Sequence, residues 1–206
     1  MIYKPFEKLY NQIKNIPTSH PAAGLIIIWC GLTKILCFSD HTYIVVKEGN
    51  KVVTKKISEI KNGDLVLVYN GKEQKFAKVL KNDKIEGKYE FYQIKMKKLN
   101  DSEKTKEIKV TGEHIMITFD ENQEIKLINA QDLKGNEYIN TDDGLYQVYE
   151  INKEISDDKY NLVVKGGIVY ANGVLVSTIC SLEQAKIIKP TLEEWKYFQE
   201  NKIEVN

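Results

Sequence analysis

The chain has 206 residues, of which 42% are hydrophobic and 29% charged, a balance typical of a globular protein that buries a core. Its formal net charge is +1, and every basic residue is a lysine. The sequence therefore offers neither a positive field nor the bidentate arginines that clamp phosphate, so nucleic-acid binding is not predicted. Three cysteines and three histidines are too few and too scattered for a disulfide framework or a metal site, so we expect no metal and no cofactor.

The first 36 residues read as a polar segment followed by an apolar one. Residues 3–16 carry apolar side chains at helical spacing and end before Pro17, which predicts a helix. Residues 22–36 are largely apolar, but the run is shorter than the ~20 residues of a spanning helix and Lys34 interrupts it. We interpret this run as a buried strand or helix. A signal or anchor of a secreted or membrane-associated precursor stays open, because lysines precede the run, and the compartment is not assigned.

From Thr42 onward the pattern changes to about a dozen short alternating segments rich in Val, Ile and Tyr. Turn-forming residues such as Asn172-Gly173 separate them, which predicts an all-β domain. After Pro190, Thr191 is an N-cap candidate with Glu194 three residues later, so a short C-terminal helix is expected.

The β-rich region contains a weak internal echo. The stretches KVVTKKISEIKNGDLVLV and QEIKLINAQDLKGNEYIN, about 71 residues apart, share the same order of a strand, a short turn of helix and a second strand. This order aligns Ile57 with Ile128 and Ile60 with Leu133. His41 and His114 are offset by a similar amount. The echo predicts a pseudo-two-fold domain, and chemistry is often placed where two such halves meet.

A cysteine and a histidine stand out as candidates for catalysis. Cys37 ends the apolar run, and His114 closes the turn Thr111-Gly112-Glu113-His114 between two expected strands. An imidazole takes and gives protons near neutral pH, and a thiolate is a good nucleophile, so thiol chemistry is available if the two meet. The alternative is that both are structural residues.

Several blocks of the sequence resemble the Hint family, the self-processing modules of hedgehog proteins and inteins. They occur in the family's order between residues 37 and 180: CFSDHT, ISEIKNGDLVLVYNG, VTGEHIMITF, INAQDLKGNEYI and YNLVVKGGIVYANGVLVST. The resemblance implies a pseudo-two-fold β-fold. It also implies an autocatalytic, cysteine-dependent activity that acts once on the module's own upstream segment, in a monomer.

The resemblance assigns roles to four residues. Cys37 would attack the carbonyl of Leu36 and convert the peptide bond into a thioester, an N-to-S acyl shift. His114 would protonate the departing amine of Cys37, and Thr111 would support the same nitrogen. The thioester would then react with water, a thiol or an alcohol.

Departures from the family pattern narrow the outcome. Ser177 and Thr178 stand where splicing inteins have His and Asn, so splicing is not expected and the ending is closer to the hedgehog type. Cys180 lies two residues further on, as a small buried residue or as an auxiliary thiol. Leu36 replaces the glycine that hedgehogs have before the cysteine, and its bulk is expected to slow attack.

Two further residues are possible auxiliaries. Asp83 lies two residues late for the aspartate with which hedgehogs activate a sterol hydroxyl, which makes sterol transfer the less favoured outcome. His41 lies between Cys37 and the first long strand, where it would either help to deprotonate the thiol or be solvated.

We therefore divide the chain into an upstream segment (1–36), a Hint autoprocessing domain (37–180) and a helical C-terminal tail (181–206). The main alternative is an inactive Hint-like β-module with a structural or interaction role. A cysteine hydrolase acting on foreign substrates ranks last, because nothing in the spacing predicts a substrate groove.

Overall fold

The computed structural model describes residues 36–69, 74–119, 125–165 and 168–178. Within these ranges the chain is nearly all β, which confirms the predicted fold class, and its twelve strands join one antiparallel sheet. Two short 3-10 helices interrupt the strands, η1 (Ile57–Glu59) and η2 (Ala130–Asp132). The strands are β1 (Phe38–Ser39), β2 (Tyr43–Glu48), β3 (Lys51–Lys56), β4 (Leu65–Tyr69), β5 (Gln74–Lys98), β6 (Asp101–Thr111), β7 (Ile115–Phe119), β8 (Ile125–Asn129), β9 (Tyr138–Thr141), β10 (Gly144–Val164), β11 (Ile168–Ala171) and β12 (Val174–Ser177).

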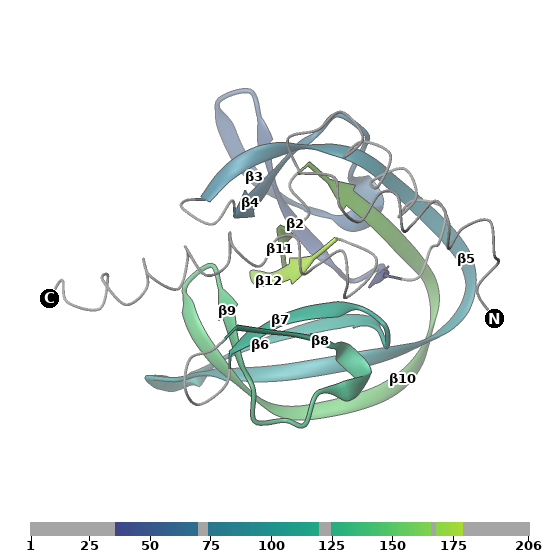
Figure 1. Ribbon diagram of the computed structural model, residues 1–206. Coiled ribbons are helices and arrows are strands. Elements are labelled where there is room, and N and C mark those ends of the chain that lie inside the picture. The colour runs from purple at the N-terminus through teal and green to yellow at the C-terminus, as the bar shows by residue number, and fades with distance from the viewer. Residues whose placement is uncertain (1–35, 70–73, 120–124, 166–167, 179–206) are drawn as a thin grey trace, which may run out of the picture.

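Strands β5 and β10 are longer than the sequence pattern predicts. Each joins two segments that the pattern separates, and the two strands pair with each other from Tyr146↔Lys98 to Val164↔Val79. The expected break is a bend: Gly87 and Asp158 both adopt positive φ, and the Gly87 N–H donates to the Asp158 carboxylate over 3.2 Å. These two residues introduce a β-bulge into a continuous pair of strands and do not end the strands. Figure 1 shows both strands sweeping around the side of the molecule.

The described strands form two similar halves. In the first, β2 pairs with β3 and β4; in the second, β7 pairs with β8 and β9. The helices η1 and η2 occupy equivalent places, so Ile57 matches Ala130 and not Ile128, whereas Ile60 and Leu133 are both C-caps as the echo predicts. The pseudo-two-fold arrangement is therefore confirmed with a shifted alignment.

A tight hairpin closes the described part of the module. Asn172 and Gly173 adopt φ values of 50° and 72° between β11 and β12, as an Asn-Gly turn requires. The Asn172 side chain accepts from the Tyr43 N–H at 2.7 Å and donates to the Glu107 carbonyl at 3.1 Å. The turn thus ties the C-terminal hairpin to β2 and β6.

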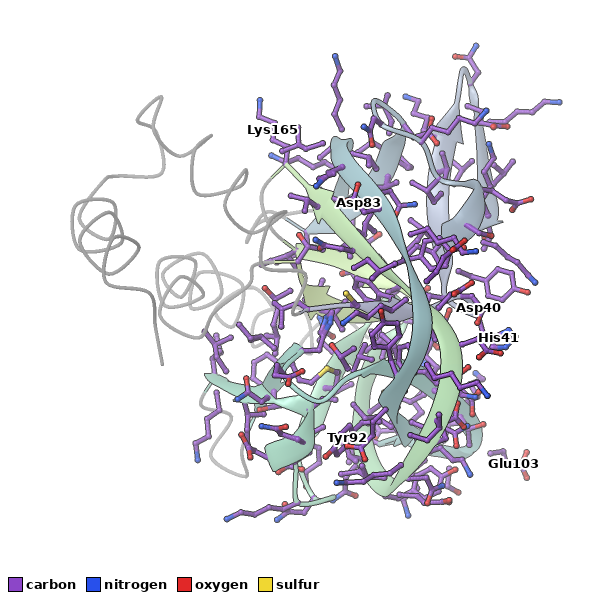
Figure 2. All side chains as sticks on the ribbon, turned by 90° about the vertical axis from the view of Figure 1, so that its right-hand side faces the viewer. Asp40, His41, Asp83, Tyr92, Glu103 and Lys165 are labelled. Carbon is purple, nitrogen blue, oxygen red and sulfur yellow. The ribbon has the colours of Figure 1, made fainter. Side chains whose placement is uncertain are left out.

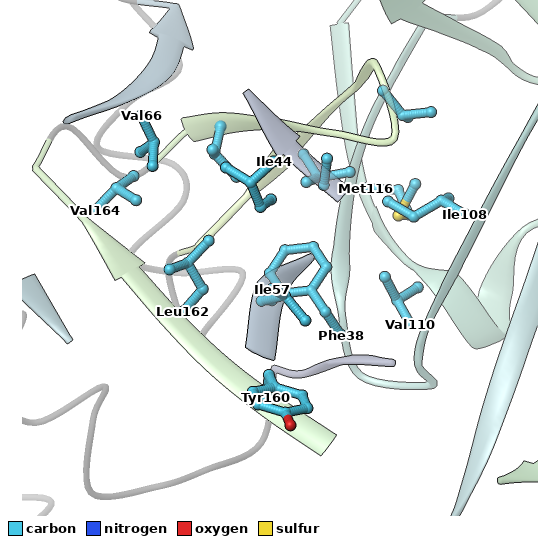
Figure 3. Close-up of a cluster of buried hydrophobic side chains, with 14 of the residues drawn as sticks. Phe38, Ile44, Ile57, Val66, Ile108, Val110, Met116, Tyr160, Leu162 and Val164 are labelled. Atoms are coloured by element: carbon cyan, nitrogen blue, oxygen red, sulfur yellow. The ribbon is translucent and has the colours of Figure 1, made fainter. Parts of the chain in front are cut away.

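The main hydrophobic core lies between the two halves and draws residues from most strands. Phe38 is completely buried at its centre, among Ile57, Val110 and Tyr160 (Figure 3). Because β1 is only two residues long, this one aromatic side chain supplies most of its anchorage.

The helices predicted over 3–16 and after Thr191 lie outside the described residues, as does the expected end of the Hint domain at residue 180. Among the residues that are described, no helix has the length and apolar character needed to cross a membrane.

Candidate active site

Strand β1 lies between β10 and β6, which places Cys37 at the point where the long strands pass the start of the module. Phe38 is opposite Tyr160 of β10 on one side and Val110 of β6 on the other. Both Cys37 and Leu36 are buried, with Cys37 inaccessible and Leu36 4% exposed. The Leu36–Cys37 peptide bond is therefore held inside the sheet.

Thr111 is bonded to the backbone of Cys37 by two hydrogen bonds. The Cys37 N–H donates to Thr111 Oγ1 at 3.1 Å, and the Thr111 N–H donates to the Cys37 carbonyl at 3.0 Å. In the first bond the acceptor is the Thr111 side-chain hydroxyl, where a regular antiparallel pair would use the Thr111 backbone carbonyl. This bond fixes the nitrogen that an N-to-S acyl shift would release.

His114 lies beside the same junction and is completely buried. Its ring meets that of Phe38 edge-on, with centroids 4.6 Å apart and planes at 66°. The turn that carries it is closed by its own N–H, which donates to the Thr111 carbonyl at 3.0 Å. The Thr-x-x-His spacing thus brings both side chains to the Cys37 backbone.

Burial sets the protonation of His114. Loss of solvation lowers the pKa of its imidazole to about 3, and the backbones of Ser177 and Cys37 oppose this only partly. Neither ring nitrogen makes a hydrogen bond of good geometry, so these two backbones act as nearby dipoles and not as firm partners. The ring is neutral at physiological pH. It therefore offers one N–H donor and one basic nitrogen to the junction.

The end of β12 reaches the same place. Ser177 is fully buried, and its backbone lies near His114. Thr178 is 5% exposed, and its hydroxyl has no hydrogen-bond partner. The first and last described strands thus meet at one histidine.

The auxiliary candidate His41 does not lie at this junction. His41 is exposed, makes a 3.4 Å ion pair with Asp40 and projects outward (Figure 2). The fold counterpart of His114 is Thr42 and not His41: Thr42 donates to the Ser39 carbonyl, as His114 does to Thr111.

Asp83 and Cys180 complete the set of candidates. Asp83 is on β5 (Figure 2), opposite Asn161 of β10, and its carboxylate pairs with Lys81 at 2.5 Å. Cys180 lies outside the described residues. Within the ranges that the structure covers, no three His, Cys, Asp or Glu side chains gather in a way that could hold a metal.

The sequence analysis missed one residue of this neighbourhood. Asn161 is 4% exposed, and its side-chain nitrogen has no hydrogen-bond partner. It interrupts the buried run Tyr160–Val164. A single polar residue within such an apolar strand could have identified it. Burying an amide costs free energy unless a hydrogen bond compensates the cost, so such a residue indicates a functional position.

The described strands form a pseudo-two-fold antiparallel fold, and solved structures with the Hint fold of inteins superpose on it. The gp41-1 intein superposes with a TM-score of 0.54 at 23% identity, covering 69% of this chain and 98% of that one. A DnaB intein from Synechocystis sp. PCC 6803 gives 0.53 at 18% identity, with 69% and 97% covered. A bacterial intein-like domain from Clostridium thermocellum gives 0.54 at 23% identity, with 68% and 97% covered.

At these identities the likeness establishes the fold. The neighbours are inteins and an intein-like domain, so they do not favour a hedgehog-type module over a splicing one. No protein-family model matches the chain, and no curated protein matches it either.

Proposed function

We propose that the chain is a self-processing domain that cleaves its own Leu36–Cys37 peptide bond through an N-to-S acyl shift. The observation that carries the proposal is the geometry of the junction. The Cys37 nitrogen is held by Thr111 Oγ1 at 3.1 Å, next to a completely buried histidine, inside a Hint fold.

The reaction follows from the groups at the junction. The Cys37 sulfur bonds to the Leu36 carbonyl carbon while its proton passes to the basic ring nitrogen of His114, and the carbonyl oxygen becomes an oxyanion. Collapse of that intermediate breaks the C–N bond, and the Cys37 nitrogen takes that proton from His114 to become an amine. The neutral imidazole of His114 provides acid–base assistance of a kind worth about 10²–10⁴-fold, while Thr111 holds the leaving nitrogen.

Resolution of the thioester by water or a thiol would release residues 1–36 and regenerate the Cys37 thiol. Splicing is not part of the proposal, because the buried Ser177 and Thr178 provide no asparagine to cyclise. In this respect the module is of the hedgehog kind. Sterol transfer has less support, because Asp83 is paired with Lys81.

The proposal predicts that the purified 206-residue chain splits into fragments 1–36 and 37–206, faster with dithiothreitol or hydroxylamine. Intact-mass spectrometry over time measures the split. Cys37→Ala should abolish it, whereas Cys180→Ala, which removes another thiol and leaves Cys37 in place, should cleave like the parent. Cleavage at the same bond in the Cys37→Ala protein would contradict the mechanism.

One observation favours a second candidate, an inactive Hint-like module with a structural or interaction role. Both Leu36 and Cys37 are buried, so a nucleophile reaches the thioester only if the junction opens. The same experiment separates the two candidates: a parent chain that keeps its full mass after prolonged thiol treatment supports the inactive module.

A further inference from the structure

The register of β1 against β10, extended by one residue before Phe38, sets Asn161 across from Cys37. Strands β1 and β10 are antiparallel with Phe38 opposite Tyr160 and Ser39 opposite Lys159, so the next pair along brings Cys37 opposite Asn161. Side chains that face each other in this way project from the same side of the sheet, with Cβ atoms about 5 Å apart. Asn161 and Cys37 therefore share one face.

The Leu36 carbonyl points toward the strand that carries Asn161. The Cys37 N–H is directed at Thr111, on the β6 side of β1. In a trans peptide the carbonyl and the following N–H point in opposite directions, and no described peptide bond is cis. The oxygen of the Leu36–Cys37 peptide bond must therefore face β10.

The Asn161 amide has no acceptor in the resting structure. The residue is 4% exposed, and its Nδ2 makes no hydrogen bond. Asp83, which is opposite Asn161 on β5, forms an ion pair with Lys81 at 2.5 Å. Native proteins rarely leave a buried donor unsatisfied, so this one calls for an acceptor that is absent in the ground state.

Resting on the acyl shift proposed above, we propose that Asn161 Nδ2 donates a hydrogen bond to the oxyanion that forms on the Leu36 carbonyl oxygen. When the Cys37 sulfur bonds to the carbonyl carbon, the electron pair of the C=O bond moves to the oxygen on the β10 side. The amide then gains the acceptor that it lacks at rest. A donor satisfied only in the transition state lowers the barrier without stabilising the substrate.

The test compares three variants of the full chain by intact-mass kinetics over a dithiothreitol series. Asn161→Ala removes the donor, and Asn161→Asp keeps the size but places an ionised acceptor there. Asn140→Ala is the matched control, because Asn140 is equally buried at 3% exposure but lies on β9. Far-UV circular dichroism checks that each variant is folded.

At saturating thiol the observed rate reports the acyl shift. We expect both Asn161 variants to lower this plateau by roughly a hundredfold to a thousandfold, with the half-saturating thiol concentration unchanged, and Asn140→Ala to match the parent. A folded Asn161→Ala protein that cleaves at the parental plateau, or an Asn161→Asp protein that is faster, would overturn the role of Asn161 and leave the acyl shift standing. A parent chain that never cleaves would overturn both.

Discussion

His114 is fully buried near the backbones of Ser177 and Cys37, and the loss of hydration lowers the pKa of its imidazole to about 3. The unfolded chain binds a proton at this imidazole below a pH of about 6.5, whereas the folded chain does not until the pH nears 3. Between those values the unfolded state holds more protons, so the free energy of unfolding falls as the pH falls. The slope contributed by one such group is at most about 1.4 kcal/mol per pH unit.

Urea denaturation at a series of pH values between 3 and 7 measures this contribution. His114→Gln has no ionisable group at the position, and the carboxylates common to both proteins cancel in the comparison. We expect the stability curve of the parent to drop more steeply than that of the variant below a pH of about 6.5. Parallel curves would show that the imidazole is not kept neutral by burial.

At this scale the sequence indicated which residue types could do chemistry, but not all of their neighbours. Thr111 and His114 belong to one local turn pattern, whereas their place beside the Cys37 nitrogen was expected only from the resemblance to the Hint family. Asn161 depends on the register of β10 against β1, which no local pattern specifies. His41 was a plausible partner by spacing alone, and the fold directs it outward.

Strand β1 depends on Phe38 for its place in the sheet. The strand has two residues, and this side chain is completely buried against residues from both halves (Figure 3). Phe38→Ala should cost about 3–5 kcal/mol of unfolding free energy, because it leaves a cavity that surrounding strands cannot close. It should also slow autocleavage, since the ring of Phe38 supports that of His114.

Phe76→Ala is the control for this prediction. Phe76 is on β5 and is only partly buried, and the Lys47 ammonium lies over its ring, 5.9 Å from the ring centroid. Its removal should cost about 1 kcal/mol or less, the usual range for a substitution outside the core. Chemical denaturation of the three proteins checks the order, and equal losses in the two variants would mean that Phe38 does not anchor β1.

The elements were predicted best where alternation and turns agree. The Asn172-Gly173 hairpin follows from local turn chemistry, and the predicted match of Ile60 with Leu133 holds because they are the C-caps of η1 and η2. The long strands exceed the predicted short segments, and Gly87 and Asp158 adopt positive φ where each strand bends. The hydrogen bond from the Gly87 N–H to the Asp158 carboxylate joins the two strands at the bend, and it links residues far apart in the sequence.

The whole molecule is held together by strands that belong to both halves. Strand β5 begins beside β4 in the first half and ends beside the start of β10, while β10 begins beside β9 in the second half and ends beside the start of β5 (Figure 1). Neither half can lose its sheet without unpairing these strands from the other. The echo in the sequence predicted two halves. It did not predict that β5 and β10 connect them, because these paired strands are far apart in the sequence.

This architecture predicts a single cooperative unfolding transition. Ile44 and Met116 occupy equivalent places on β2 and β7, and both are completely buried in the main core. Replacing either with Ala should cost about 2–5 kcal/mol, and since the halves unfold together, each substitution should shift the whole transition. Urea denaturation followed by far-UV circular dichroism and by tyrosine fluorescence should give coincident curves with an unchanged dependence on urea concentration. If one variant instead splits the transition into two steps, then the long strands do not couple the halves.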